Sequence, residues 1–229
     1  AQGAGKARLN QFAQHEGLGL SRGHQRGGRQ DGVAVAAAHQ TLRRAEIRDN
    51  VLWLDGETLT SERVKKLINV ALMECDCVAQ HTIVAGGEQA CDPHDEGSGP
   101  LPAHRSIIFD VFPRSAETRY FADMSRTVVR GTPSPELTRL YHAVKDAQEE
   151  AITKIRDGAD GAAIHQGICD RFEKAGYKTG LVNGRMQGYF HGTGHGATAV
   201  GREVGKGVLP HDPRRARLRH RRRPERRRF

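Results

Sequence analysis

The sequence is poor in aromatic side chains, which make up 5% of its 229 residues, and hydrophobic residues make up 37%. This composition is lean for an enzyme but is not that of a disordered chain, and the length suffices for one sizeable core. No apolar run is long enough to span a membrane, and residues 1–30 lack the apolar centre of a signal peptide. We therefore expect a cytoplasmic protein that does not bind membranes.

Cysteine is also scarce, with four residues at Cys75, Cys77, Cys91 and Cys169. The first two are too close together for a structural zinc knuckle, and no second pair of Cys or His completes one. We expect all four to be reduced thiols, which agrees with a cytoplasmic location.

Basic residues outnumber acidic residues, which gives a formal net charge of +9, but this excess of basic residues is confined to one segment. Residues 214–229 hold ten of the 36 basic residues and one of the 27 acidic residues, so 26 of each sign remain elsewhere. The arginine cluster could bind phosphates and give salt-dependent affinity for nucleic acid. No aromatic residues are interleaved with it, so nucleic acid is the less favoured partner. Its Arg, Pro, Ala and His content is instead typical of a GC-rich gene translated out of frame.

The chain is accordingly divided into three segments. Residues 1–32 show no sustained period and stay unassigned, as a disordered or out-of-frame segment. Residues 33–196 carry the periodic patterns of a folded domain. Residues 197–229 have few apolar side chains, so we interpret them as a disordered tail and a frameshift product.

Four helices are predicted. The first covers residues 33–47, and the second begins at a Thr60 or Ser61 cap. The third begins at Ser134-Pro135, and the fourth runs from an Asp160 cap to a Gly176 stop. Their expected inward residues are Val64, Leu67, Ile68, Ala71, Leu72 and Cys75 in the second, Leu137, Leu140, Tyr141, Val144, Ile152 and Ile155 in the third, and Ile164, Ile168 and Phe172 in the fourth.

Between the second and third helices the period changes to that of strands, over residues 82–85, 107–112 and 120–129. A loop at 88–102 follows the first strand, and residues 113–119 have the composition of a hairpin connection. Strands and helices grouped in blocks, rather than in strict alternation, predict the α+β class.

Asp110 and Asp123 interrupt two apolar strands. A hairpin that turns at Ala116-Glu117 would set the two carboxylates directly opposite each other on one face. Two like charges in such a place would not both stay ionised without a cation between them. The alternative is that one aspartate binds Arg126 or a backbone amide while the other faces solvent.

Histidines provide further candidates. His191 and His195 are four residues apart, but the intervening glycines favour a loop or strand that a ligand or another backbone approaches closely. The alternative is a glycine-rich turn with two exposed histidines. His94 lies in the long loop before the strand of Asp110. A single histidine in a loop is by itself weak evidence for a functional site.

The order of these features resembles the creatinase, prolidase and methionine aminopeptidase family. The strings Ile83-Val-Ala-Gly-Gly87, Cys91-Asp-Pro-His94, Ile108-Phe-Asp-Val-Phe-Pro-Arg114 and Phe190-His-Gly-Thr-Gly-His-Gly196 are most similar to its Xaa-Pro peptidase branch. The resemblance implies the pita-bread fold, a curved antiparallel sheet with flanking helices. It also implies a peptide substrate and a centre of two divalent ions, manganese, cobalt, zinc or iron.

The resemblance assigns roles by motif position. Asp110 would bind one metal, Asp123 would bridge both, and His195 would be the imidazole ligand of the second. His94 and His191 would contact the substrate and the tetrahedral intermediate. The ions would lower the pKa of a bridging water that attacks the scissile carbonyl.

The family pattern also has two glutamate ligands downstream of the second histidine, and here only Glu203 and Glu225 follow, in unrelated contexts. The expected site is therefore incomplete at its C-terminal side. The alternative function is a non-catalytic pita-bread domain that binds peptides or protein partners. The residues leave the oligomeric state open, including a homodimer.

Overall fold

A computed structural model of the chain describes residues 22–119, 121–156, 159–182, 185–190 and 192–193. Two compact units divide within one helix, between His142 and Ala143.

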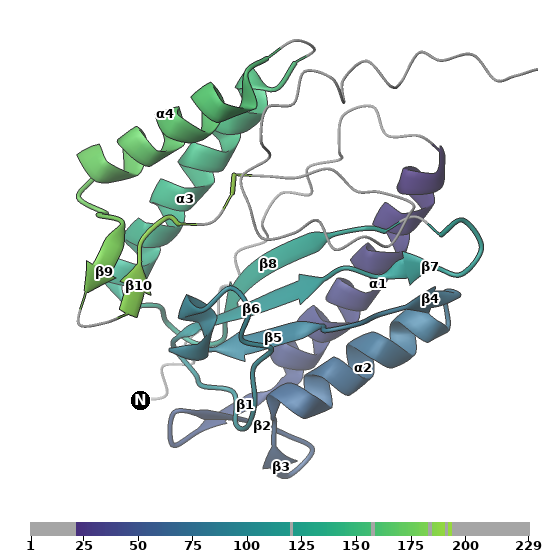
Figure 1. Cartoon of the computed structure of the whole chain (residues 1–229). Coiled ribbons are helices and arrows are strands. Elements are labelled where there is room, and N and C mark those ends of the chain that lie inside the picture. Colours follow the sequence, from purple (N-terminus) through teal and green to yellow (C-terminus); the bar gives the residue numbers. More distant parts are fainter. Residues whose placement is uncertain (1–21, 120, 157–158, 183–184, 191, 194–229) are drawn as a thin grey trace, which may run out of the picture. The chain divides into compact units, whose positions relative to one another are not determined.

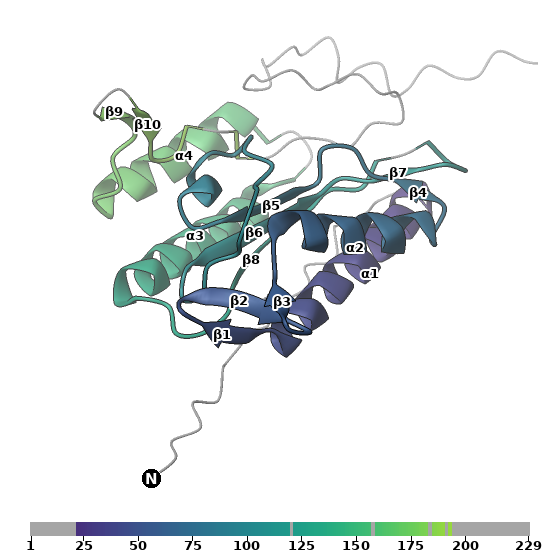
Figure 2. The same cartoon turned by 90° about the horizontal axis from the view of Figure 1, so that it is seen from below.

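Two helices of the first unit, α1 (Arg22–Arg44) and α2 (Ser61–Met73), lie on one face of a sheet (Figures 1 and 2). In α2 the Thr60 side chain accepts a hydrogen bond from the Arg63 amide, as an N-cap does. The prediction of a helix at 33–47 was wrong at both ends, because α1 begins at Arg22 and ends at Arg44. The buried apolar residues described in α1 are Ala34, Val35, Ala38 and Leu42, all within the predicted range.

The central sheet of this unit is antiparallel in the order β5-β6-β8. Its strands are β5 (Ile83–Gly86), β6 (Ser106–Val111) and β8 (Met124–Val129). The predicted strands at 82–85 and 107–112 each lie within one residue of these, whereas the third begins four residues later than predicted.

Shorter strands complete the unit. The hairpin of β1 (Glu46–Arg48) and β2 (Val51–Leu54) turns at Asp49 and Asn50, both with positive φ, as a two-residue hairpin turn requires. Strand β3 (Glu57–Thr58) pairs with β2. The short strands β4 (Cys77–Val78) and β7 (Arg114–Ser115) pair with each other, and the 3-10 helix η1 (Gln89–Cys91) follows β5.

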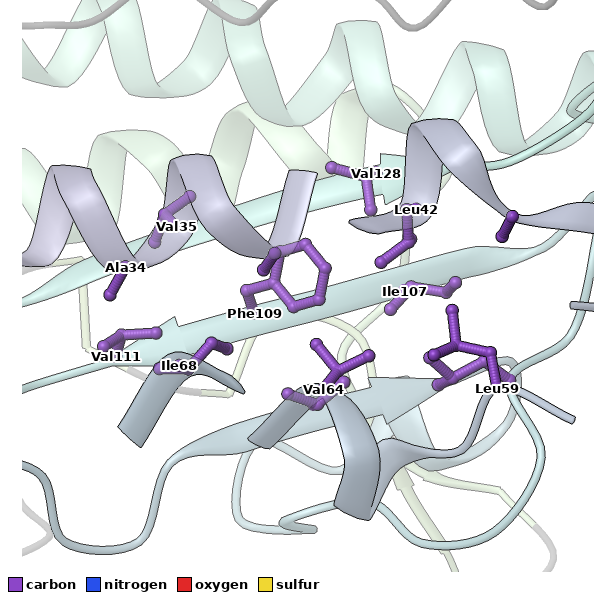
Figure 3. Packing of buried hydrophobic residues seen from close by; sticks show 14 of the residues in the cluster. Ala34, Val35, Leu42, Leu59, Val64, Ile68, Ile107, Phe109, Val111 and Val128 are labelled. Carbon is purple, nitrogen blue, oxygen red and sulfur yellow. The ribbon is translucent and has the colours of Figure 1, made fainter. Parts of the chain in front are cut away.

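The core lies between the sheet and the two helices (Figure 3). Ile107, Phe109 and Val111 alternate along β6 and are fully buried. They pack into the cluster that α2 supplies with Val64 and Ile68. Because side chains alternate across a strand, the intervening residues of β6, Asp110 among them, lie on the opposite face of the sheet.

The second unit begins inside α3 (Pro135–Lys154) and continues with α4 (Gly161–Lys174). The predicted Asp160 cap is confirmed, since its carboxylate accepts hydrogen bonds from the amides of Ala162 and Ala163. An antiparallel hairpin of β9 (Gly180–Val182) and β10 (Arg185–Gln187) follows.

Alanines of α3 and larger side chains of α4 form the core of this unit. Ala147 and Ala151 pack with Ile168 and Phe172. The predicted inward face of α3 was partly wrong, because three of its members are exposed, at 42%, 49% and 61% of their surface: Leu140, Val144 and Ile155. The buried positions belong to small residues, which let the α4 side chains approach closely.

Candidate active site

Asp110 lies at the end of β6, on the face of the sheet that the two helices do not cover. It is paired across the ladder with Ser125, whose hydroxyl donates a 2.6 Å hydrogen bond to Asp110 Oδ1. Val111 pairs with Met124, so the ladder ends one residue before Asp123 is reached. Asp123 is exposed.

The predicted opposition of Asp110 and Asp123 was therefore wrong by two residues. The turn is longer than a two-residue hairpin, because the Arg119 amide donates to the Ser115 carbonyl and Arg119 takes a positive φ. The amide of Ala122 donates to Pro113 at 3.0 Å, which keeps the same register beyond the ladder. A shift of two residues does not change which face of the sheet a side chain is on. Position 123 therefore has the same facing as Ser125, the partner of Asp110.

For Asp110, the structure does not support the alternative in which Arg126 binds one of the aspartates. The Arg126 guanidinium donates to the Ser125 carbonyl. Arg126 pairs with Phe109 in the ladder, so its position in β8 is on the face that the helices cover. The partner of Asp110 is a neutral hydroxyl. Sequence reasoning missed Ser125, although the correct register alone would have identified it.

His94 lies in the loop after η1 and its side chain is half exposed. Its amide donates to Asp92 Oδ1 at 2.8 Å, and its Nδ1 is 3.8 Å from the same oxygen. The carboxylate of Asp92 therefore holds the backbone at His94 and lies close to its ring. His191 and His195 lie outside the described residues.

The loop that carries His94 is fastened to β5 and α2. The Val84 amide donates to the Glu96 carbonyl at 3.0 Å, and Lys65 Nζ donates to the Gly97 carbonyl at 2.8 Å. The Gly99 amide donates to Glu62 Oε1, and this backbone hydrogen bond is the main cause that lowers the pKa of Glu62. The segment after His94 is thus held at several points rather than at its ends alone.

The donor set can be compared with the metals that the resemblance implies. Carboxylate oxygens and imidazole nitrogens suit manganese, iron, cobalt and zinc, and a hydrogen bond such as that from Ser125 orients a metal-binding carboxylate. Asp110 and Asp123 fit this role. Within the described ranges, no three side chains of His, Cys, Asp or Glu come together in an arrangement that could hold a metal ion. The predicted third ligand, His195, is not among those ranges.

A second cluster lies in the other unit, around Thr193. The Tyr189 hydroxyl donates to Thr193 Oγ1 at 2.7 Å, and His165 Nδ1 is 2.8 Å from the same oxygen. Burial raises the pKa of Tyr189. Sequence reasoning did not find this cluster, although Thr193 lies inside the His-Gly-Thr-Gly-His string.

The fold and the order of these residues are those of the pita-bread class. Residues 25–222 match the sequence profile described as Metallopeptidase family M24. The chain therefore belongs to this family.

Among curated relatives, Xaa-Pro aminopeptidase 1 of Streptomyces coelicolor is 31% identical over 178 residues, which cover 72% of this chain and 36% of that protein. Xaa-Pro dipeptidase of Lactobacillus helveticus is 30% identical over 127 residues, covering 54% of this chain and 30% of that protein. The chain thus spans about a third of the length of these relatives.

Solved structures support the fold. The prolidase from Pyrococcus furiosus aligns with a TM-score of 0.58 and 19% identity, over 68% of this chain and 43% of that one. The X-Pro aminopeptidase from Thermotoga maritima aligns with a TM-score of 0.57 and 22% identity, over 69% and 43%. The predicted α+β pita-bread fold is confirmed.

Over the residues described, no helix is both long enough and apolar enough to cross a membrane. All four cysteines are free thiols in this structure.

Proposed function

We propose that this chain supplies catalytic residues of a metal-dependent peptidase that cleaves peptides with proline at the second position, in the cytoplasm. The observation that carries the proposal is the position of Asp110, oriented by Ser125 on the face of the sheet opposite to α1 and α2, with Asp123 one residue beyond the same ladder. Similarity to Xaa-Pro aminopeptidases and to an Xaa-Pro dipeptidase supports the substrate class.

In this proposal Asp110 and Asp123 hold two divalent cations together with His195. The cations would supply charge that activates a water molecule and neutralises developing negative charge on the scissile carbonyl. Ser125 holds the Asp110 carboxylate in one orientation, so that less freedom is lost when a ligand binds. His94 and His191 contact the substrate, and the fastened loop limits how far His94 can move.

The test is hydrolysis of a peptide pair that differs only at the second residue, proline or alanine, by the full chain with manganese or cobalt added. We expect cleavage of the proline peptide only, slowly because the two glutamate ligands of the family pattern are not found in their expected contexts, with loss of activity on adding a chelator. The Asp110→Asn and Asp123→Asn variants should each lose more in kcat/KM than the about 10–100-fold that loss of a hydrogen-bond partner of a metal ligand typically costs.

A matched control is Asp170→Asn, an exposed carboxylate on α4 that accepts a hydrogen bond from Gln166. It should keep the activity of the unchanged chain. Absence of hydrolysis with either metal, with peptide binding retained, would replace the proposal by the non-catalytic peptide-binding domain. Equal loss in the control and in the Asp110 variant would also refute it.

A further inference from the structure

Thr193 is held by two side chains that come from different elements. Its Oγ1 accepts the Tyr189 hydroxyl at 2.7 Å and lies 2.8 Å from His165 Nδ1. The sulfur of Cys169 is 3.6 Å from the other ring nitrogen, Nε2 of His165. A continuous line of polar contacts therefore runs from Tyr189 through Thr193 and His165 to Cys169.

The hydrogen positions along this line follow from the donors available. Because Tyr189 donates to Thr193 Oγ1, the hydroxyl hydrogen of Thr193 is available for His165 Nδ1. Nδ1 then acts as an acceptor and the ring proton lies on Nε2, directed at Cys169. This order predicts the Nε2–H tautomer of His165.

A packed frame supports both partners of Thr193. His165 and Cys169 are one turn apart on α4, which Asp160 caps. Tyr189 packs against Phe172, with ring centroids 5.0 Å apart, and its amide donates to Thr179 Oγ1 at 2.9 Å.

Gly188, directly before Tyr189, lies close to the backbone of Lys178. Gly188 has φ +83°, and a Cβ there would lie 2.4 Å from the Lys178 carbonyl oxygen. Only glycine fits this position without displacing the backbone. Tyr189 is therefore fixed through its ring, its amide and the residue before it.

The same contacts resemble those of a cysteine nucleophile with a histidine base, but the electrostatics oppose that role. Burial, followed by the charges of Asp170 and Glu173, raises the pKa of the Cys169 thiol. A nucleophilic cysteine needs the opposite shift, toward thiolate. The cluster is therefore suited to holding Thr193 in place rather than to attacking a substrate.

We propose that His165 and Tyr189 are positioning residues that fix the Thr193 hydroxyl and so hold the backbone at Gly192 and Thr193, inside the His-Gly-Thr-Gly-His string. Thr193 is two residues from His191 on one side and two from His195 on the other. The roles of those two histidines rest on the proposed function, whereas the contacts to Thr193 do not. Small misplacement of a catalytic group lowers a rate strongly, which gives such positioning its value.

The first test uses variants at Thr193 and measures amide hydrogen exchange. Thr193→Val removes the hydroxyl with little change of shape, and Thr193→Ser keeps it. We expect exchange at the Gly192 and Thr193 amides to rise about tenfold in Thr193→Val and Tyr189→Phe, as loss of a local hydrogen bond allows. Amides of Ile168 and Phe172 in the core should be unchanged, and Thr193→Ser should behave as the unchanged chain.

Cys169→Ala is the matched control, because the sulfur contacts His165 but not Thr193. It should leave exchange at Thr193 unchanged. Nitrogen chemical shifts of the His165 ring should report the Nε2–H tautomer in the unchanged chain and a mixture in Thr193→Val. Exchange within twofold of the unchanged chain in Thr193→Val and Tyr189→Phe would overturn the inference.

Peptide hydrolysis separates this inference from the proposed function. In an active chain, Tyr189→Phe and Thr193→Val should lower kcat with little change of KM, and Thr193→Ser should restore it. Faster exchange without any change of kcat would overturn the positioning role. If the unchanged chain cleaves no Xaa-Pro peptide, the proposed function fails while the exchange and tautomer results still decide whether Thr193 is fixed as proposed.

Discussion

Replacing Gly97 by alanine should unfasten the loop that carries His94. Gly97 has φ +78°, and a Cβ on it would lie 1.9 Å from the carbonyl oxygen of Val84. A carbon and a carbonyl oxygen normally approach to about 3.3 Å, so the backbones would have to separate by roughly 1.4 Å. That movement breaks the 3.0 Å hydrogen bond from the Val84 amide to Glu96.

The magnitude follows from these two effects. The left-handed conformation costs an alanine about 1–2 kcal/mol, and the lost backbone hydrogen bond about 1 kcal/mol. With residual strain we expect a total of about 2–4 kcal/mol. At a denaturant slope of about 2 kcal/mol per M, the urea midpoint should fall by about 1–2 M.

The chain contains a matched control in the same loop. Gly99 has φ +69° but no atom within 4 Å of a Cβ placed on it. Gly99→Ala should therefore lose only about 1–2 kcal/mol, from the backbone conformation. Urea unfolding can be followed by the fluorescence of Trp53, the single tryptophan, which lies in β2 of the same unit. Equal midpoints for the two variants would show that contact with Val84 does not limit position 97.

Three further outcomes are expected. Burial, then the charges of Arg43 and Arg126, lowers the pKa of His39 below 6.5, so the unfolded chain takes up this proton first. The free energy of unfolding should fall as pH drops below about 6.5, and His39→Leu should flatten that dependence between pH 7 and 5; an unchanged slope would contradict this. Asp160→Ala should destabilise α4 by about 0.5–2 kcal/mol in thermal unfolding, whereas Asp160→Asn, an equally good cap, should not. Phe109→Ala should cost about 3–5 kcal/mol in urea unfolding, and a loss below about 1 kcal/mol would mean that the core of the first unit closes over the cavity.

Local signals predicted much of the fold because they depend on neighbouring residues. The caps at Thr60 and Asp160 and the buried face of Ile168 and Phe172 follow from sequence spacing and are confirmed. The α3 face was predicted from its large apolar residues, yet Ala147 and Ala151 are the ones buried. Which face of a helix is covered depends on the element packed against it, and the period of one helix does not contain that information.

The candidate site shows the same limit. The sequence located Asp110 on a strand and Asp123 near the returning one, but the register between them depends on the length of the turn. Ser115 accepts the Arg119 amide, and this longer turn moved the pairing of Asp110 to Ser125. The Tyr189–Thr193–His165 contacts join residues up to 28 positions apart, so only the structure could bring them together.

The fastening of the loop to β5 has a consequence for how this sheet can grow. Val84 uses its amide for Glu96 and its carbonyl for the Ser61 hydroxyl, at 2.7 Å, so its outward backbone groups at the middle of this edge are already occupied. At the other end of the order β5-β6-β8, no further strand is paired with β8 within the part of the chain that the structure describes. We therefore expect a strand that extends the sheet, from this chain or from another molecule, to add beside β8, next to Ser125 and the carboxylate to which it donates.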